Sequence, residues 1–269
     1  MSKKSSINRD APLPAVAAKA LAALRARTPA RLVVGRAGPS YRTATQLELR
    51  EDHAAAVDAV QTEMDLVRDF GQELVDACEL FEVRTLAESK AEYLKRPQLG
   101  RQFGPEAQAA IREQCPGNVD LQIAIGDGLS AAAVATGVPA LLPLVIDGAQ
   151  QHGWSVGRTF AIRYCRVGIL NEIGELLAPR VVVLLVGERP GLVTAESLSA
   201  YMAFRPRRGH TDAERNLISN IHARGIPPQR AAERILALAA QMMQAETSGV
   251  AIKEQLPGQA IGKQAPRIS

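Results

Sequence analysis

The chain has 269 residues, 46% of them hydrophobic, so it is long and apolar enough to fold around a substantial core. Its 32 basic and 28 acidic side chains leave a net charge of only +4 and aromatic residues make up 4% of the chain, so nucleic acid is not an expected partner. Its three cysteines are widely separated and form no CxxC pair, which favours neither a disulfide framework nor a zinc site.

Residues 1–28 are predicted to be an N-terminal extension that carries a short helix. Its apolar residues recur at helical spacing; they are Leu13, Val16, Ala20, Leu21 and Leu24. Lys19 interrupts what would be the apolar region of a secretory signal, and no apolar run approaches the roughly 20 residues that cross a bilayer. We therefore expect an intracellular protein without a membrane segment. The helix is expected to pack on the body or on a partner subunit, and a targeting peptide is the alternative.

Residues 29–115 are predicted to be mainly helical. Thr45 and Glu48 have the spacing of a capping box, and apolar positions then recur every three or four residues, which predicts one helix from about residue 46 to 69 with a buried stripe. The stripe consists of Leu49, His53, Val57, Val60, Met64 and Val67. Residues 81–84 are expected to be extended. Pro105 predicts the start of a helix that runs toward Cys115.

Residues 116–253 alternate between strand and helix patterns, which predicts an α/β fold with a Rossmann-like parallel sheet covered on both faces. Strands are expected within residues 119–126, 158–167 and 180–187, and residues 197–206 are a candidate fourth strand. A last helix is expected to open at Pro227-Pro228 and to end at Gly249. Its apolar face consists of Ala232, Ile235, Leu236, Ala239, Met242 and Met243. Residues 254–269 have the composition of a disordered tail.

Two glycine-containing turns follow predicted strands, where open α/β sheets bind their ligands. The glycines of "IGDG" (125–128) and "VGERPG" (186–191) predict a backbone that a bulky ligand approaches closely, with Glu188 and Arg189 on the rim. Ordinary structural turns are an equal alternative, because "IGDGLSA" lacks the third glycine of a dinucleotide fingerprint. Asp127 is also a candidate N-cap of the next helix.

Other polar residues are weaker candidates. Arg36 and Arg42 flank a glycine-proline turn that suits an anion or simply solvent, and His53 is expected to be a core or interface histidine. "NIHARG" (220–225) resembles the DxHxxG box of some cobalamin enzymes, but Asn220 replaces the aspartate and no strand is expected before it, so His222 is not expected to bind cobalt. The sequence contains no recognisable Ser-His-Asp or Cys-His arrangement, so we expect no catalytic residue and no metal ligand in this chain.

Five segments, taken in order, are similar to the small (light) chain of ethanolamine ammonia-lyase. They are "VGRAGPSYRT", "CPGNVDLQIAIGDGLSAAAV", "FAIRYCRVGILNEIGELL", "VVVLLVGERPGLVTAESLSAY" and "DAERNLISNIHARGIPP". The likeness as a whole extends from about residue 29 to 253. The resemblance implies an adenosylcobalamin-dependent lyase that converts ethanolamine to acetaldehyde and ammonia by a radical mechanism. It further implies a hetero-oligomer in which the large subunit holds the substrate and this chain covers the cobalamin.

The resemblance also implies the cofactor-binding residues. The matching positions are Val167 after "YCR", Glu188 in "GERPG" and Leu217 before "ISNIH", where some relatives carry cysteine. Cobalt is expected to keep its own dimethylbenzimidazole, the base-on form. The enzyme is expected in the cytoplasm, or in a bacterial microcompartment if residues 12–25 are an address. The alternatives are a stand-alone Rossmann-like module for a nucleotide or other phosphate ligand, and a purely structural assembly subunit.

Overall fold

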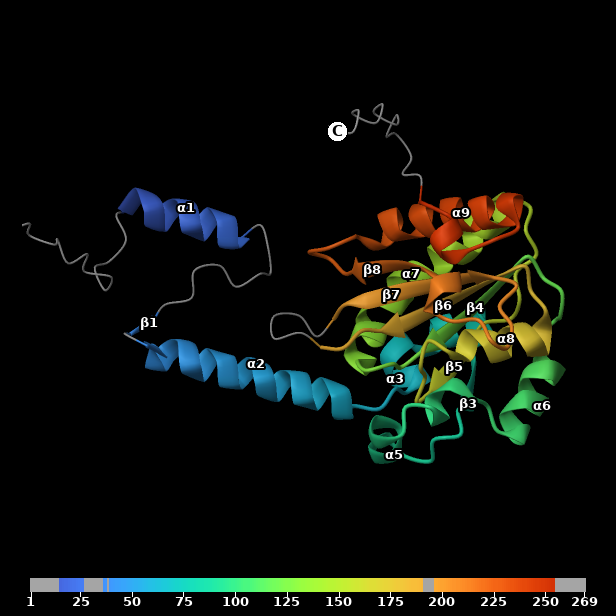
Figure 1. The fold of residues 1–269 in the computed structure, drawn as a ribbon, viewed down its shortest axis with the longest axis horizontal. Coiled ribbons are helices and arrows are strands. Elements are labelled where there is room, and N and C mark those ends of the chain that lie inside the picture. Colours follow the sequence, from blue (N-terminus) through green and yellow to red (C-terminus); the bar gives the residue numbers. More distant parts are fainter. Residues whose placement is uncertain (1–14, 27–35, 38, 191–195, 255–269) are drawn as a thin grey trace, which may run out of the picture.

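The structure is a computed structural model and describes residues 15–26, 36–37, 39–190 and 196–254. Two helices, α1 (Ala15–Ala26) and α2 (Thr43–Gln61), lie beside a body that contains the other helices (Figure 1). Between them, β1 (Arg36–Ala37) and β2 (Ser40–Tyr41) form a small antiparallel pair. Most side chains of α1 and α2 are exposed, so the main core belongs to the body.

A six-stranded mixed sheet forms the centre of the body. Its strands, in spatial order, are β3 (Phe81–Arg84), β5 (Phe160–Arg163), β4 (Leu121–Gly126), β6 (Val181–Gly187), β7 (Leu198–Phe204) and β8 (Asn216–Ile221). The first four run parallel, whereas β7 is antiparallel to β6 and β8 is antiparallel to β7. The α/β prediction is confirmed. The sheet is only partly parallel, because residues 188–197 are too few for a crossover helix.

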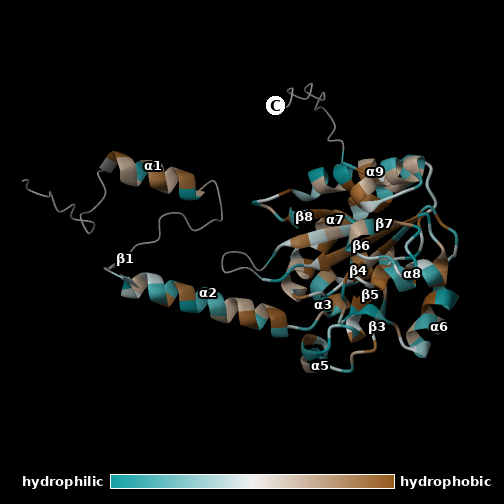
Figure 2. Ribbon diagram, viewed as in Figure 1, coloured by the Kyte–Doolittle hydropathy of each residue, from teal (hydrophilic) through white to brown (hydrophobic). Residues whose placement is uncertain are grey.

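Helices cover both faces of the sheet. One face packs against α7 (Ala131–Gln151), α9 (Pro228–Ala245), α3 (Leu66–Phe70) and α4 (Gln72–Ala77), and the other against α6 (Pro105–Gln114) and α8 (Ile169–Leu177). Along β4, Ile123 and Ile125 belong to the first core and Ala124 to the second. The central strands are hydrophobic along their length (Figure 2), as expected for strands buried on both faces.

Helix α7 is one continuous helix that retains Pro139 and Pro143 in its interior. Contrary to the expectation that no segment is apolar enough, its length and composition would suit a membrane span. However, nine of its residues are buried, and it packs against α9 and β6 as a core helix does. We therefore describe α7 as part of the body's core.

The prediction of one helix over residues 46–69 is wrong. Helix α2 begins at Thr43 and ends at Gln61, so Thr45 and Glu48 do not form a capping box. A second helix, α3, begins after Asp65, whose carboxylate accepts a hydrogen bond from the Arg68 N–H (2.8 Å). Of the predicted stripe only Met64 is buried, and Leu49 and Val60 are half-buried, because α2 projects from the body (Figure 1) and packs against little of it within the described residues.

Of the remaining predictions for helices and strands, some are confirmed and some are wrong. Strand β3, the start of α6 at Pro105 and the buried face of α9 are confirmed. Helix α9 ends at Ala245, so Gly249 does not terminate it but opens the 3₁₀ turn η3 (Gly249–Ala251). Helix α1 does not pack on the body, since its side chains are exposed. Leu13 and residues 255–269 lie outside the described residues, and the domain boundary near residue 115 stays a prediction, although β3 before it joins the sheet.

Candidate functional site

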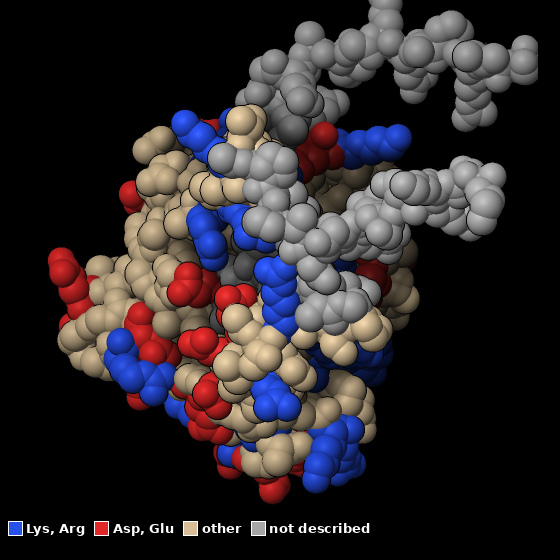
Figure 3. Space-filling view, turned by 90° about the vertical axis from the view of Figure 1, so that its left-hand side faces the viewer, with Lys and Arg blue, Asp and Glu red and all other residues tan. Residues whose placement is uncertain are grey.

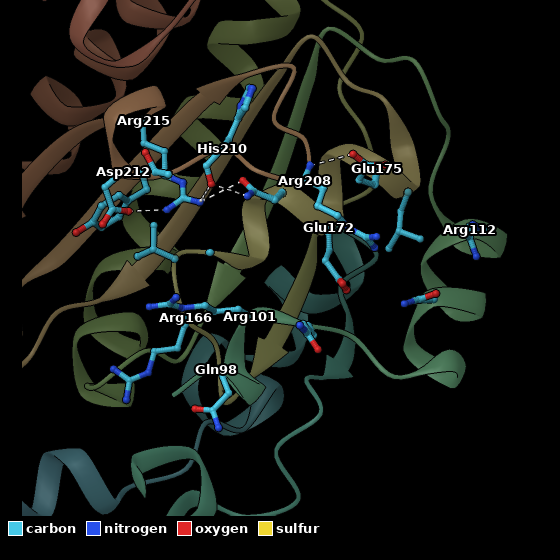
Figure 4. A pocket seen from close by; sticks show the side chains of 18 residues that line it. Gln98, Arg101, Arg112, Arg166, Glu172, Glu175, Arg208, His210, Asp212 and Arg215 are labelled. Carbon is cyan, nitrogen blue, oxygen red and sulfur yellow. Dashed lines mark hydrogen bonds and ion pairs between the residues drawn. The ribbon is translucent and has the colours of Figure 1, made fainter. Parts of the chain in front are cut away.

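A cavity of about 880 Å³ lies on the α8 side of the sheet (Figure 4). Its walls come from α6, α8, the turn η1 (Leu99–Arg101), the segment after β5 and the connection from β7 to β8, which includes η2 (Asp212–Glu214). Five arginines line it: Arg101, Arg112, Arg166, Arg208 and Arg215. Three acidic residues line it as well, Glu172, Glu175 and Asp212. Cationic groups therefore outnumber anionic ones.

The acidic residues are engaged in holding the cavity's walls together. Glu172 accepts a hydrogen bond from the Phe103 N–H (2.7 Å), and Glu175 accepts one from the Arg208 N–H (2.9 Å). Asp212 pairs with Arg215 at 2.5 Å. The first two bonds fix the segment after η1 and the β7–β8 connection against α8, so the cavity is built from segments that are far apart in the sequence.

Three buried nitrogen atoms of the cavity have no hydrogen-bond partner within the described residues: Arg166 Nε, Arg215 Nε and His210 Nδ1. An arginine Nε–H is always a donor, so two of these atoms require an acceptor. The Arg215 side chain is only 7% exposed. Burial lowers the pKa of His210, Arg207 lowers it further, and Glu214 opposes the change. The cavity thus suits a ligand with acceptor oxygens.

The three predicted cofactor-binding residues are arranged around Tyr201, which lines the cavity. Val167 lies on the cavity wall itself. Leu217 stands directly opposite Tyr201 in the β7–β8 register and is 46% exposed. Glu188 follows β6 without lining the cavity, but its charge adds to burial in raising the pKa of Tyr201. The structure therefore places Val167 on the wall and the other two beside it.

The Glu188 carboxylate already has partners within the chain. Its Oε2 accepts a hydrogen bond from the Ser197 hydroxyl (2.9 Å). Its Oε1 accepts from the Ser199 hydroxyl and from the Asn220 N–H (3.3 Å). A carboxylate offers about four acceptor positions, so capacity for one more donor remains. Glu188 thus joins the ends of β6, β7 and β8.

The expectation that the glycine turns leave room for a ligand is wrong at Gly128 and Gly187, whereas Gly191 of the second turn lies outside the described residues. A Cβ atom on Gly128, whose φ is +57°, would lie 2.3 Å from the carbonyl oxygen of Gly187. One on Gly187 would lie 2.0 Å from the carbonyl oxygen of Ser130. The glycines let two turns of this chain pack on each other, as in the alternative interpretation of ordinary structural turns. Asp127 is not an N-cap either, because Ser130 caps α7 by accepting from the Ala133 N–H (3.1 Å).

The other candidate residues lie away from the cavity. Arg42 and His53 are exposed on or beside α2, so His53 is not a core residue within this chain, and the Arg36 side chain lies outside the described residues. Strand β8 does precede His222, contrary to the prediction.

His222 is buried with both ring nitrogens engaged, by Asn220 Oδ1 (2.7 Å) and by the Arg224 N–H (3.2 Å). The described ranges contain no group of three or more His, Cys, Asp or Glu residues that could hold a metal ion.

Sequence patterns did not identify Arg166, Tyr201, His210 or Arg215 as site residues. Arg166 is the last residue of the "YCR" motif that located Val167, so the signal was present although the residue was not singled out. The segment "RPRRGHTDAER" (205–215) carries a high density of charge directly after a predicted strand, which is the pattern that could have indicated the cavity. The face of the molecule seen in Figure 3 shows acidic and basic side chains interspersed.

Comparison with known proteins gives the family. The family described as ethanolamine ammonia-lyase light chain (EutC) matches residues 18–253. The ethanolamine ammonia-lyase small subunit of Clostridium perfringens is 44% identical over 230 residues, which are 86% of this chain and 76% of the relative. That of Clostridioides difficile is 42% identical over 236 residues, 88% and 78% of the two chains. That of Clostridium acetobutylicum is 39% identical over 233 residues, 87% and 94% of the two chains. The chain therefore belongs to the family of ethanolamine ammonia-lyase small subunits, as its five sequence segments predicted.

Proposed function

We propose that this chain is the small subunit of an adenosylcobalamin-dependent ethanolamine ammonia-lyase and that it covers the cofactor while a large subunit holds the substrate. Family membership supports a subunit of a two-subunit lyase. The observation that carries the cofactor assignment is the cavity, which Val167 lines together with Arg166 and Arg215, whose buried Nε atoms have no acceptor among the described residues.

The residues present fit this cofactor. Adenosylcobalamin carries a phosphodiester and many amide groups around a largely apolar ring system. Arg166 Nε and Arg215 Nε are buried donors that suit phosphate or amide oxygens, and the exposed side chain of Leu217 suits the apolar part. A thiol at the Leu217 position is not needed if the contact is one of van der Waals packing. When bound, the cofactor supplies the radical chemistry of the reaction.

This chain's own role is to bind the cofactor and to exclude water from it. We assign to Arg166 and Arg215 the binding of acceptor oxygens, and to Glu188 the acceptance of one further amide or hydroxyl donor from the cofactor. We propose that the cofactor would keep its own base on cobalt; both ring nitrogens of His222 are engaged within the chain, so this histidine would not be available to the metal. The substrate-binding and catalytic residues are assigned to the large subunit, because this chain carries none by pattern.

The large subunit is proposed to cover surfaces that this chain leaves open. Leu47 and Val57 on α2 are 58% and 46% exposed, and Val16 and Leu24 on α1 are exposed as well. Exposed apolar groups on projecting helices are typical of sites that contact a partner. We propose a cytoplasmic enzyme, with packaging in a microcompartment through residues 12–25 as the alternative.

Reconstitution tests the function. The purified chain is expected to show no lyase activity alone. Mixed with the large subunit, it should restore acetaldehyde formation that requires added adenosylcobalamin. A stand-alone nucleotide-binding module would instead bind a nucleotide by itself and would restore no activity, and that result would overturn the proposal.

Substitution of Glu188 tests the site. In the reconstituted enzyme, Glu188→Ala is expected to raise the apparent dissociation constant of the cofactor roughly 5- to 150-fold, which corresponds to about 1–3 kcal/mol for a hydrogen bond to a charged group. The control is Glu233→Ala, because Glu233 pairs with Arg230 on the surface of α9. The apparent dissociation constant of the cofactor should not change in this variant. An unchanged constant in Glu188→Ala would favour a purely structural assembly subunit.

A further inference from the structure

A strained turn leads from β5 to the cavity. Tyr164, the first residue after β5, has a φ of +59°. A bulky residue rarely adopts this left-handed conformation, which is strained and persists only where surrounding groups impose it. Arg166 and Val167 follow within three residues and line the cavity. The position of this part of the wall therefore depends on what holds the turn.

A single buried carboxylate holds it. Asp127 follows β4, the neighbouring parallel strand, and is only 1% exposed. Its Oδ2 accepts a hydrogen bond from the Tyr164 N–H (3.0 Å), and its Oδ1 accepts one from the Cys165 N–H (2.8 Å). Each oxygen thus binds one of two successive amides. This arrangement fixes the direction in which the backbone leaves β5.

Helix α5 (Lys90–Lys95) closes the turn from the other side. The buried Lys90 Nζ lies 3.6 Å from Asp127 Oδ2. The Tyr93 hydroxyl lies 2.9 Å from the Gly128 carbonyl oxygen and 2.8 Å from that of Cys165, and its proton can be donated to either. Burial raises the pKa of Asp127, and Lys90 and the backbone amides oppose that rise.

A buried ion pair is a weak source of stability, because removing both charges from water costs about as much as their attraction returns. A role in fixing geometry accounts better for this pair. Tyr93 also contacts Arg166, the residue after the turn, since the Arg166 guanidinium lies over the Tyr93 ring, 4.3 Å from the ring centroid. The Arg166 N–H donates to the Gly100 carbonyl oxygen (2.8 Å), which completes the support of the wall.

We propose that Asp127, Lys90 and Tyr93 are positioning residues, which hold the strained Tyr164–Cys165 turn and thereby set Arg166 and Val167 in place for the cofactor. None of the three lines the cavity, so they act through the turn. The inference rests on the proposed function, because it takes the cavity wall to contact the cofactor.

Asp127→Asn is the direct test. The amide keeps the shape of the carboxylate, but its NH₂ group must face one of the two backbone N–H groups, so one of the paired hydrogen bonds is lost. In the reconstituted enzyme we expect the apparent dissociation constant of the cofactor to rise about 10-fold. The KM for ethanolamine at saturating cofactor should not change. Tyr93→Phe keeps the ring beneath Arg166 and is expected to give a smaller rise of about 3-fold.

Hydrogen exchange on the full chain without cofactor or partner provides a readout apart from activity. Asp127→Asn should accelerate exchange of the Tyr164 and Cys165 amides. The matched control is Asp120→Asn at the opposite end of β4, where the carboxylate accepts from the Ser155 N–H (2.9 Å) and from Arg180 (3.0 Å). This control should lower stability without changing the cofactor constant or the exchange of the turn.

The outcomes separate this inference from the proposed function. If Arg166→Ala leaves the cofactor constant unchanged, the assignment of the cavity wall fails, whatever Asp127→Asn does. If Arg166→Ala weakens cofactor binding but Asp127→Asn and Tyr93→Phe do not, the positioning role alone is overturned. Should Asp127→Asn fail to assemble with the large subunit, the positioning role is decided by Tyr93→Phe, from its cofactor constant and from hydrogen exchange of the Tyr164 and Cys165 amides in that variant.

Discussion

Replacing Gly187 by alanine distinguishes a packed turn from a turn that admits a ligand. The new Cβ would lie 2.0 Å from the Ser130 carbonyl oxygen and 2.8 Å from that of Asp127, where ordinary contacts begin at 3.4 Å. The Ser130 carbonyl must therefore withdraw by more than about 1 Å in a close-packed region. Neither atom is the flexible end of a side chain, so the backbone itself has to move.

The expected cost follows from what that movement disturbs. Overpacking of a core costs about 1–3 kcal/mol. The movement also strains the hydrogen bond from the Leu129 N–H to the Gly187 carbonyl oxygen (3.1 Å) and the Ser130 cap of α7 (3.1 Å). Each of these contributes about 1 kcal/mol. We therefore expect Gly187→Ala to lower the free energy of unfolding by roughly 3–5 kcal/mol.

Urea unfolding of the full chain measures this loss against two controls. Gly104→Ala should cost less than about 1 kcal/mol, because the nearest atom to its new Cβ is Leu86 Cδ2 at 3.6 Å. Gly153→Ala isolates the conformational cost, about 1–2 kcal/mol, since its φ is +74° and nothing lies within 4 Å. If Gly187→Ala unfolded at the same urea concentration as Gly104→Ala and instead lost cofactor binding in the complex, the packing argument would be refuted.

Two further predictions concern ionisable groups. The Ser155 N–H and Arg180 lower the pKa of Asp120 against the effect of burial, so its contribution to stability is present above the unfolded pKa of about 3.9 and is lost as pH falls through the folded value. Asp120→Asn should thus cost about 1–2 kcal/mol in urea unfolding at pH 7 and progressively less as the pH falls below the unfolded pKa of about 3.9, and a difference that stays constant with pH would contradict this. Burial raises the pKa of all three cysteines, that of Cys115 to about 11 and that of Cys165 well above its usual value, but Cys78 alone is partly exposed. A thiol reagent at pH 8 should therefore modify only Cys78 in the native chain and all three cysteines in denaturant. Rapid modification of a second native thiol would show that the body is more open than described.

Local patterns predicted most of the body, and they failed where tertiary context decides. The strands β4 and β6 are continuous apolar runs that can only be buried, so their prediction needed no knowledge of the fold. Strand β8 was missed because it is covered on one face alone, and Asn216, Ser219 and Asn220 interrupt its apolar pattern. The break after α2 was missed because the apolar periodicity continues across Thr62 into α3, although the backbone there is extended.

The candidate site was predictable only in part, for a geometrical reason. Val167 followed from the family motif, but Arg166 and Arg215 are 49 positions apart in the sequence and meet only after the β7–β8 connection folds over α8. The glycines correctly marked turns at the ends of β4 and β6. The prediction that they admit a ligand was wrong, because they admit another turn of the chain. A glycine that admits a ligand and one that admits another turn look alike until the opposing backbone, here Ser130, is known.

The same geometry explains why the cavity does not lie at the strand tips. In an open parallel sheet the crevice beyond the carboxyl ends receives the ligand, but here Lys90 and Tyr93 of α5 fill the space beyond β4 and β5. The antiparallel strands β7 and β8 extend the sheet beyond the parallel strands, and Tyr201 and Leu217 lie on this extension. A ligand in the cavity would therefore lie against the face of the sheet beside Tyr201 and not beyond the strand tips.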